Sequence, residues 1–537
     1  MNYKKWIPED PFLTETGRGK EKAVLGGTGD YYGANSLENF SSASSLSLTH
    51  EDAQGFLDYP TSFPGKAANF WFKDSGVKVW EYEETYDNWQ DLYGMDAVMV
   101  FYHSGHGNMD ANGVFQAPLG GVWDGRDWAF SNNMAFANER LRYLFLSTCL
   151  SLRVSGGHSP VRTWWNPNKG GLRMLFGYET TSVDHPSYGA WFWDEWKKGK
   201  SFCRAFLDAS WRISHGQVPV VMAAGANQAE AVNRLNNERY FSSAPVTKGW
   251  YQWMWMGTIP SKAAKYSMEI PRGTTSIILD NNLFDDNRMT DIAKKSGIPL
   301  RNAASILFDK NGNRQISSRT AQVNVNSEGA LNINLGTPNF KNTTTIDEKK
   351  ATDIARWNIS NLGFDKGIEL KQGNTRQKFT CGATSKGSGT VGKTEIIETI
   401  IQFRQMFNGV ESINSDHGLI TVSVDNDGKV TNIYNSTKGI AGSTKGPVSG
   451  VKAPPEKTRS TDISKEKLFE HKIKRIVNGS VGGNGTKLSS GKVNILSDKA
   501  GYDFSGNIGT IVHQRDVEVA LDEAFAKRYK LRVPYFD

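Results

Sequence analysis

The chain has 537 residues, which is enough for more than one domain with a sizeable core. Its formal net charge of +7 is small for this length, and the basic residues are interspersed with acidic ones, which argues against nucleic acid as a partner. The three cysteines are too few for a disulfide framework, and no apolar run approaches the roughly 18 residues of a membrane span.

The first hundred residues contain short predicted strands and one predicted helix. Lys22 to Leu25 predicts a first short strand, and Thr49 to Leu57 predicts a polar helix that begins with a start signal. Val77 to Glu81 predicts a second strand. An order of strand, helix and strand is typical of an α/β domain.

Two apolar runs then end on reactive side chains. Asp96 to Gly107 ends in His106 followed by glycine, and Leu141 to Cys149 ends in a thiol. Each run predicts a buried strand, and ligands of open α/β sheets bind at the carboxyl ends of the strands. We therefore expect the histidine and the cysteine to face each other across one crevice.

This pair of side chains is suited to nucleophilic catalysis. Cys149 would be the nucleophile, and His106 would relay the proton that a thiol with an ordinary pKa must lose. The backbone N–H groups of Gly107 and Cys149 would form an oxyanion hole, because a glycine lets a substrate carbonyl approach closely. Taken alone, Cys149 would as readily be a small core residue.

The motif Phe101-Tyr-His-Ser-Gly-His-Gly107, together with Tyr143-Leu-Phe-Leu-Ser-Thr-Cys149, resembles the caspase, metacaspase and legumain clan of cysteine peptidases. The resemblance spans about Lys20 to Gly257. It implies a caspase-like, mostly parallel sheet flanked by helices, a peptide substrate, and catalysis by His106 rather than His103. Metacaspases carry an acidic residue, and caspases a glutamine, two positions before the cysteine. This chain has Ser147 there, so neither specificity is implied.

The resemblance also places specificity and processing after Cys149. Glu179 and Asp184 follow the next strand, where members of the clan build the primary specificity pocket, and they would make it acidic. Ser147 belongs to the same candidate pocket. The loop Arg153 to Gly171 is a candidate processing site, although an ordinary surface loop is the more frequent explanation of such a segment. His103 is expected to be a packed residue, because positions i and i+3 of a strand point to opposite faces.

The rest of the N-terminal region continues the α/β pattern. Leu172 to Tyr178 and Val218 to Ala224 predict strands, and Gly189 to Ser214 predicts one aromatic-rich helix. All but one of the 16 tryptophans lie between Trp6 and Trp255, which indicates a domain boundary beyond them. We expect a peptidase domain over 1–260, a β-rich connecting domain over 261–345, an α+β module over 346–450, and a basic linker with an α/β tail over 451–537.

The C-terminal half contains a phosphate-loop pattern and a module-like segment. Gly387 to Thr394 matches G-x-x-x-x-G-K-[ST], with a helix expected over Glu395 to Phe407, but the buried strand that should end at the first glycine is missing. Ile400 to Tyr434 resembles propeptide-type modules of secreted metallopeptidases, with a strand or helix followed by a hairpin that turns at Asp425 to Gly428. This resemblance implies that the module regulates or inhibits the N-terminal cleft.

The remaining segments predict structure without chemistry. Residues 271–338 predict short strands, Lys452 to Lys474 a solvated linker, and Gln514 to Lys530 an amphipathic helix. No cofactor or metal site is expected, because no cluster of Cys and His has ligand spacing and Asp425 to Gly428 is typical of a hairpin turn rather than a calcium loop.

The leading hypothesis is a cysteine endopeptidase that acts through an acyl-enzyme. The alternatives are an inactive caspase-like scaffold that binds a partner, and a nucleotide-binding switch at Lys393. The compartment stays open between the cytoplasm and a secreted mature form, because the scarcity of cysteine and the propeptide-like module point in different directions.

Overall fold

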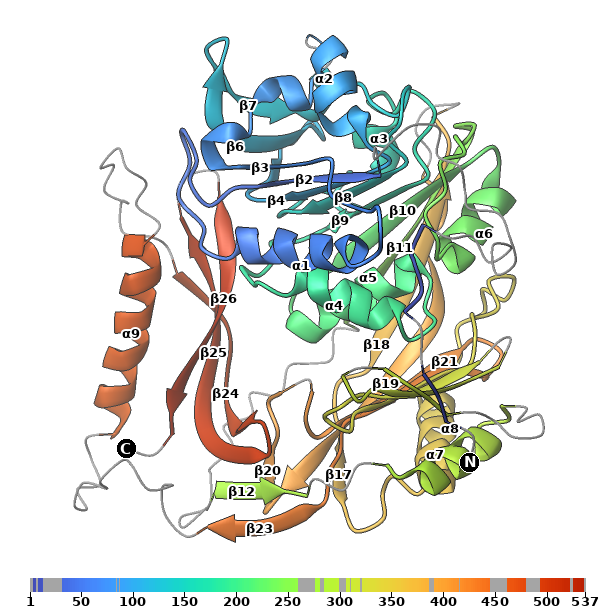
Figure 1. Ribbon diagram of the computed structural model, residues 1–537. Helices are drawn as coiled ribbons and strands as arrows, with labels where there is room; N and C mark the ends of the chain where they lie inside the picture. The colour runs from blue at the N-terminus through green and yellow to red at the C-terminus, as the bar shows by residue number, and fades with distance from the viewer. Residues whose placement is uncertain are drawn as a thin grey trace.

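The computed structural model describes residues 3–5, 8–12, 31–83, 85, 87–258, 276–280, 284–298, 306–309, 311–318, 321–385, 391–414, 416–444, 461–479, 493–521 and 525–535. The strand predicted at Lys22 to Leu25 lies outside these residues. The chain is a mixed α/β protein with one large mixed sheet, as Figure 1 shows.

The N-terminal region is an α/β unit. Its elements are β2 (Tyr32–Ser36), α1 (Thr49–Thr61), β3 (Phe70–Lys73), α2 (Asp87–Tyr93), β4 (Val100–Ser104), β5 (Asn108–Met109), β6 (Phe115–Trp123), β7 (Arg126–Phe130), β8 (Tyr143–Ser147), α3 (Pro160–Trp164), β9 (Met174–Tyr178), α4 (Tyr188–Trp196), α5 (Phe202–Ile213), β10 (Pro219–Gly225), α6 (Gln228–Asn237) and β11 (Trp250–Thr258). Strands β3, β2, β4, β8 and β9 are parallel neighbours in that order, and β10 and β11 continue the sheet antiparallel.

The central strands are buried on both faces. Every residue of β4, β8 and β9 is buried, which explains why their sequences are continuous apolar runs. Residues Phe56 of α1 and Phe192 of α4 pack with Phe145 of β8 on one face. Trp164 of α3 and Phe115 of β6 pack on the other. The predicted strands that end at the histidine and the cysteine are thus in the middle of the sheet.

The C-terminal half is built mainly of antiparallel strands, with β1 from the N-terminus added at one edge. Its elements, with β1, are β1 (Tyr3–Lys5), β12 (Ser276–Leu279), α7 (Asp286–Lys295), β13 (Ile306–Phe308), β14 (Arg314–Ser317), β15 (Gln322–Val325), β16 (Leu331–Asn334), α8 (Glu348–Asn361), β17 (Glu369–Gln372), β18 (Arg376–Ala383), β19 (Glu395–Phe407), β20 (Val410–Glu411), β21 (Leu419–Asp425), β22 (Val430–Asn435), β23 (Ile440–Thr444), α9 (Thr461–Gly479), β24 (Val493–Ser505), β25 (Ile508–Ala520) and β26 (Ala526–Pro534).

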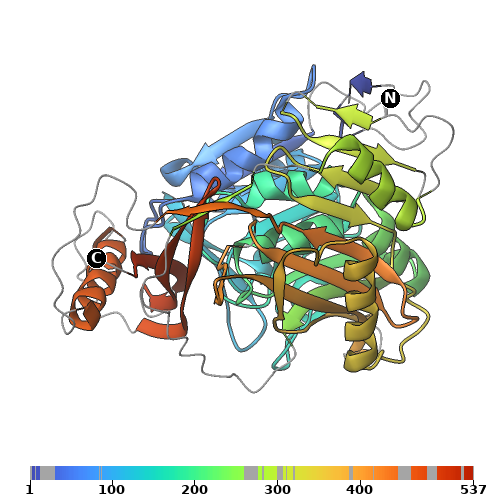
Figure 2. The same cartoon turned by 90° about the horizontal axis from the view of Figure 1, so that it is seen from below.

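The large sheet crosses the expected boundary near residue 260. Strand β11 pairs with β18 from Tyr251↔Ala383 to Thr258↔Arg376, and β18 pairs in turn with β19. The sheet then runs through β21, β22, β16, β15, β14 and β13 to β1. Helices α7 and α8 pack on this part of it, and Figure 2 shows α8 against its strands. The 346–450 segment is therefore joined to the α/β unit by backbone hydrogen bonds.

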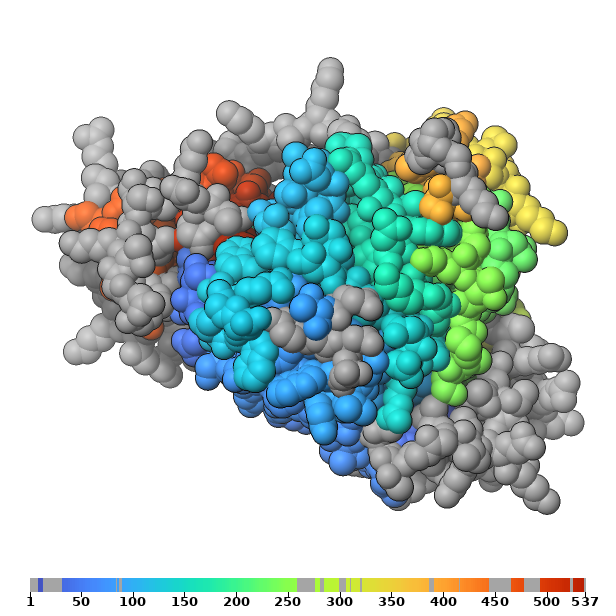
Figure 3. All heavy atoms as spheres, turned by 90° about the horizontal axis from the view of Figure 1, so that it is seen from above, coloured from blue at the N-terminus to red at the C-terminus, as the bar shows by residue number. Residues whose placement is uncertain are grey.

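A second sheet is formed by the C-terminal strands. Strands β24 and β25 form a long hairpin, β26 pairs with β25, and β12 and β23 extend the sheet at one end. Figure 1 shows β26 extending from the β-rich part of the molecule to the edge of the α/β unit. Figure 3 shows the face of the α/β unit from above, with the C-terminal strands at one flank.

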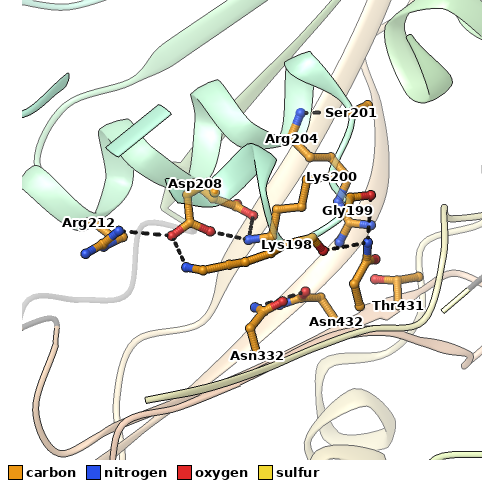
Figure 4. A network of polar contacts seen from close by, with 12 residues as sticks. Lys198, Gly199, Lys200, Ser201, Arg204, Asp208, Arg212, Asn332, Thr431 and Asn432 are labelled. Carbon is orange, nitrogen blue, oxygen red and sulfur yellow. Dashed lines mark hydrogen bonds and ion pairs between the residues drawn. The ribbon is translucent and has the colours of Figure 1, made fainter. Parts of the chain in front are cut away.

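A buried polar network joins the two halves of the chain. Figure 4 shows the loop between α4 and α5 facing Asn332 and Asn432 of β16 and β22. In this interface Lys200 Nζ lies 2.7 Å from Asp208 Oδ2, and Lys378 Nζ lies 3.1 Å from Glu398 Oε2 and 3.8 Å from Asp208 Oδ1. Lys378 thus connects α5 with strands β18 and β19.

Several predicted elements were wrong. The helix predicted at Gln514 to Lys530 is instead the strands β25 and β26, because apolar residues at every second position form one buried face. The helix predicted at Glu395 to Phe407 is strand β19, so the phosphate-loop pattern lacks the helix N-terminus that would bind a phosphate; its residues 387–390 lie outside the described part.

Three further boundaries differ from the sequence prediction. Val77 to Glu81 is not a strand but ends in a short 3₁₀ turn, and β3 precedes it. The helix predicted at Gly189 to Ser214 is divided into α4 and α5 at Gly199, whose φ of 77° a continuous helix excludes. Residues 461–474 of the predicted linker belong to helix α9.

Candidate active site

His106 and Cys149 lie at the carboxyl ends of neighbouring parallel strands. Strands β4 and β8 pair from Val100↔Tyr143 to Ser104↔Ser147. The same register, continued two residues past each strand, places His106 level with Cys149. Both are buried, with exposed fractions of 0% and 3%. The sheet therefore places these two residues level with each other at the ends of neighbouring strands.

The backbone around this pair is tightly packed. A Cβ added at Gly107 would lie 2.8 Å from the carbonyl oxygen of Cys149 and 2.8 Å from Thr148 Oγ1, so only glycine fits at this position. Leu150, directly after the cysteine, has a φ of 55°, which is uncommon for a residue with a side chain and places a sharp turn there.

Two backbone donors beside the thiol are free for a ligand. Within the described residues, neither the N–H of Gly107 nor that of Cys149 donates to an acceptor. Gly107 packs closely against the backbone carbonyl of Cys149. Paired N–H groups of this kind can stabilise an oxyanion on a carbonyl carbon that the thiol attacks.

The imidazole of His106 is neutral and held in one orientation. Its Nε2 lies 2.9 Å from the carbonyl oxygen of Ser44, and its ring packs between those of Phe40 and Phe525 at 4.8 and 4.7 Å. Burial, together with the charge of Lys527, lowers the pKa of His106 to about 3, although the bond to Ser44 opposes this.

The partner at Nε2 determines the tautomer of this ring. A carbonyl oxygen can only accept a hydrogen bond, so Nε2 of His106 carries the proton and Nδ1 keeps its lone pair. Within the described residues Nδ1 is buried and has no hydrogen-bond partner. A neutral imidazole with a free lone pair is the state that can accept a proton from a thiol.

The thiol of Cys149 is surrounded by polar groups from two segments. Its Sγ accepts a hydrogen bond from the backbone N–H of Ser182 at 3.3 Å and lies 3.5 Å from Ser182 Oγ. It also lies 3.5 Å from the carbonyl oxygen of Ala526, at the start of β26. The C-terminal strand therefore reaches the candidate nucleophile.

The contact with the C-terminal strand continues along the backbone. Arg528 N donates to the carbonyl of Ser182 at 3.3 Å, and Asp184 N donates to the carbonyl of Arg528 at 3.2 Å, in a parallel bridge. Lys527 is only 3% exposed, and its Nζ lies 3.1 Å from Ser182 Oγ. Burial raises the pKa of Asp184, and the charge of Lys527 opposes this shift.

The other predicted pocket residues occupy different positions. Glu179 accepts hydrogen bonds from the backbone N–H of Val154 and from the Ser155 hydroxyl, so it holds the loop after Cys149. The Ser147 hydroxyl lies beside the buried carboxyl of Asp52 and lowers its pKa, against the larger effect of burial. Of the three predicted pocket residues, only Asp184 faces Lys527.

Two more sequence predictions are placed by the structure. His103 lies in the core, with Nδ1 2.8 Å from the hydroxyl of Tyr82, as expected for a packed residue on the opposite face of β4. The loop Arg153 to Gly171 contains the short helix α3, and Trp164 in it is fully buried.

Sequence reasoning did not find four residues of this site. Ser44 orients His106, Ser182 contacts the thiol, and Phe525 and Lys527 cover the pair. Ser44 and Ser182 lie in serine- and threonine-containing loops that no motif marks. The alternating apolar pattern of the tail was the signal that could have revealed a strand.

The α/β unit matches a family model. A family model described as a domain of unknown function (DUF6345) matches residues 32–256, the α/β unit from β2 to β11. No curated protein matches the chain. The matched segment contains His106 and Cys149, and it ends before β26.

The described residues contain neither a membrane-spanning helix nor a cluster of metal-ligating side chains. No helix in the described part of the chain is long and apolar enough to cross a membrane. In the same residues, no group of three or more His, Cys, Asp or Glu side chains is placed to hold a metal ion.

Proposed function

We propose that the chain is a cysteine endopeptidase of caspase-like fold, with Cys149 as nucleophile and His106 as base. The observation that carries the proposal is the common register of these residues on β4 and β8, with the free Nδ1 of His106 buried at the same level. A packed core cysteine would need neither a neutral imidazole nor two free backbone N–H groups beside it.

The reaction follows from these groups. His106 Nδ1 takes the thiol proton as Sγ attacks the peptide carbonyl carbon, and the N–H groups of Gly107 and Cys149 stabilise the oxyanion. The protonated His106 then gives its proton to the leaving amine, the C–N bond breaks and a thioester remains. Water, deprotonated by His106, hydrolyses the thioester and restores the thiol.

The Ser182 to Asp184 edge supports a peptide as the substrate. It hydrogen-bonds to the extended backbone at Arg528, as it would to the backbone of a bound peptide, and the thiol lies against the carbonyl of Ala526. An extended chain is thus the kind of ligand that this cleft accommodates.

The test is peptide cleavage that depends on Cys149. A mixed peptide library is incubated with the full chain, with Cys149→Ala and with His106→Gln, each also in a Lys527→Glu background that weakens the contact of β26. We expect both substitutions to lower cleavage at least 1000-fold. The matched control is Cys203→Ala, which removes a different buried thiol and should leave cleavage unchanged.

The occupied cleft also favours a second candidate, a non-catalytic caspase-like scaffold. In that case β26 would be a permanent part of the fold, and no peptide would be cut in either background although Cys149 becomes accessible in Lys527→Glu. Cleavage that persists in Cys149→Ala would refute the peptidase proposal.

A further inference from the structure

Residues 525–528 cover the candidate active site from the far end of the chain. The ring of Phe525 stacks on His106 at 4.7 Å, the carbonyl oxygen of Ala526 lies 3.5 Å from Cys149 Sγ, and Lys527 Nζ lies 3.1 Å from Ser182 Oγ. Three consecutive residues thus contact the proposed base, the proposed nucleophile and Ser182. A peptide substrate cannot reach the thiol while this segment is in place.

The segment is held by its C-terminal sheet as well as by the cleft. Strand β26 pairs with β25 from Ala520↔Ala526 to Val512↔Pro534, and further along the strand Lys530 Nζ donates to the carbonyl of Ile213 in α5. The hydroxyl of Ser44 donates to the carbonyl of Leu521 at 3.1 Å, just before the segment. The blocking contacts therefore come from one strand end, whose release breaks the pairs of residues 526–528 with β25 while the pairs from Tyr529 onward persist.

Lys527 is the anchor of the segment in the cleft. A lysine is rarely buried unless it is paired, yet Lys527 is only 3% exposed. Its Nζ points to Ser182, and the buried Asp184 lies two residues after that serine. The backbone hydrogen bonds that Ser182 and Asp184 make with Arg528 align the 182–184 segment with the first residues of β26.

We propose that residues 525–528 are a built-in inhibitor of the Cys149 site, anchored by Lys527 between Ser182 and Asp184, and that displacement of this strand end opens the site. This inference rests on the proposed function and specifies its regulation. It also replaces the 346–450 segment, which the sequence suggested as the inhibitor, by the start of β26. The 346–450 segment is joined to the far side of the sheet, through β18 and β11.

The first experiment measures access to the thiol and does not require activity. The full chain is treated with iodoacetamide, and alkylation of each cysteine is followed by mass spectrometry. Lys527→Glu replaces the buried cation whose charge stabilises the Asp184 carboxylate by a second carboxylate, and this reversal of a buried charge should raise the alkylation rate of Cys149 by roughly 100-fold. Cys203 and Cys381, which are buried away from the tail, should keep their slow rates.

The control is a charge reversal in the same strand but away from the cleft. Arg532 lies further along β26 and pairs with Asp503 at 2.8 Å, so Arg532→Glu changes the charge of the strand equally without touching Ser182. It should leave the alkylation rate of Cys149 within about 3-fold of the original. An equal increase in both variants would mean general loosening of the strand and would overturn the anchoring role of Lys527.

A second variant and a peptide guard against misfolding. Phe525→Ala removes the ring on His106 without changing charge and should raise Cys149 alkylation at least 10-fold. A synthetic peptide with the sequence of residues 525–534, added to Lys527→Glu, should slow alkylation again, whereas the same peptide with glutamate for the lysine should not. Unchanged Cys149 alkylation in both Lys527→Glu and Phe525→Ala refutes the inhibitor.

The two proposals fail differently in these assays. Fast alkylation with new Cys149-dependent cleavage supports both. Fast alkylation without cleavage of any peptide would show that the strand end covers Cys149, and it would refute the peptidase proposal. If the original chain cleaves peptides as fast as Lys527→Glu, the inhibitor proposal is refuted and the peptidase proposal stands.

Discussion

Replacing Lys378 by methionine should destabilise the whole chain. Lys378 Nζ lies 3.1 Å from Glu398 Oε2, both side chains are 1% exposed, and the same ammonium lies 3.8 Å from Asp208 on α5. Methionine fills nearly the same volume, so the loss is chiefly electrostatic. Glu398 is left buried with a hydrogen bond from Thr431 and without its cationic partner.

The expected loss is about 3–5 kcal/mol in the free energy of unfolding, the usual cost of removing one member of a buried ion pair. Asp208 loses less, because Lys200 Nζ stays 2.7 Å away. The double variant Lys378→Met with Glu398→Leu leaves no unpaired charge in this pair, and it should recover all but about 1 kcal/mol of the loss.

Urea unfolding at pH 7, followed by tryptophan fluorescence and by circular dichroism, measures this cycle. Nearly all tryptophans belong to the α/β unit, whereas circular dichroism reports on the whole chain. Because β11 and β18 make one sheet of both halves, the two signals should change together. A loss below about 1 kcal/mol in Lys378→Met would show that water replaces the ammonium, and would refute the buried-pair reasoning.

Two further predictions concern pH and the site backbone. Against the effect of burial, Lys378 helps to hold the pKa of Glu398 below 4.5, so its stabilisation is present above that pH and is lost as the pH falls through the lowered pKa of the folded state. The difference in unfolding free energy between the original chain and Lys378→Met should therefore shrink as pH falls from 6 to 3, and a constant difference in acid unfolding would contradict this. Gly107→Ala should cost about 1–3 kcal/mol and abolish Cys149-dependent cleavage in the Lys527→Glu background, since the new methyl group would lie 2.8 Å from the Cys149 carbonyl oxygen. Thermal unfolding and the peptide assay test this, with Gly442→Ala as a control whose Cβ meets open space and whose φ, like that of Gly107, lies outside the left-handed region.

The placement of His106 and Cys149 at the ends of neighbouring strands was predictable because it depends on local patterns. Each residue follows a buried apolar run, and parallel neighbours in a sheet bring their carboxyl ends to one edge. The occupant of the cleft was not predictable in the same way. Lys527 lies hundreds of residues from Cys149 in sequence, and only the pairing of β26 with both β25 and the Ser182 edge brings it there.

The failed predictions share a physical origin. The segments Glu395 to Phe407 and Gln514 to Lys530 were predicted as helices, yet both form strands. Nearly every residue of β19 is buried, and β25 and β26 bury residues largely in alternation. A two-residue period decides against a helix whenever a neighbouring strand is available to pair. The continuation of the sheet from β11 to β18 was also not predictable, because no sequence feature near Trp250 identifies β18 as the partner strand.

Ser44 connects the orientation of His106 with the position of the tail. Its carbonyl oxygen fixes Nε2 of the imidazole, and its hydroxyl donates to Leu521, just before the inhibitory segment. When the strand end leaves, His106 loses the ring of Phe525 and the charge of Lys527, and both losses favour a higher pKa than the value of about 3 in the closed state. The carbonyl of Ser44 still holds the ring in place. Opening would therefore convert a buried, very weak base into a stronger one without changing its tautomer, so access to the thiol and the basicity of its partner would increase in the same step.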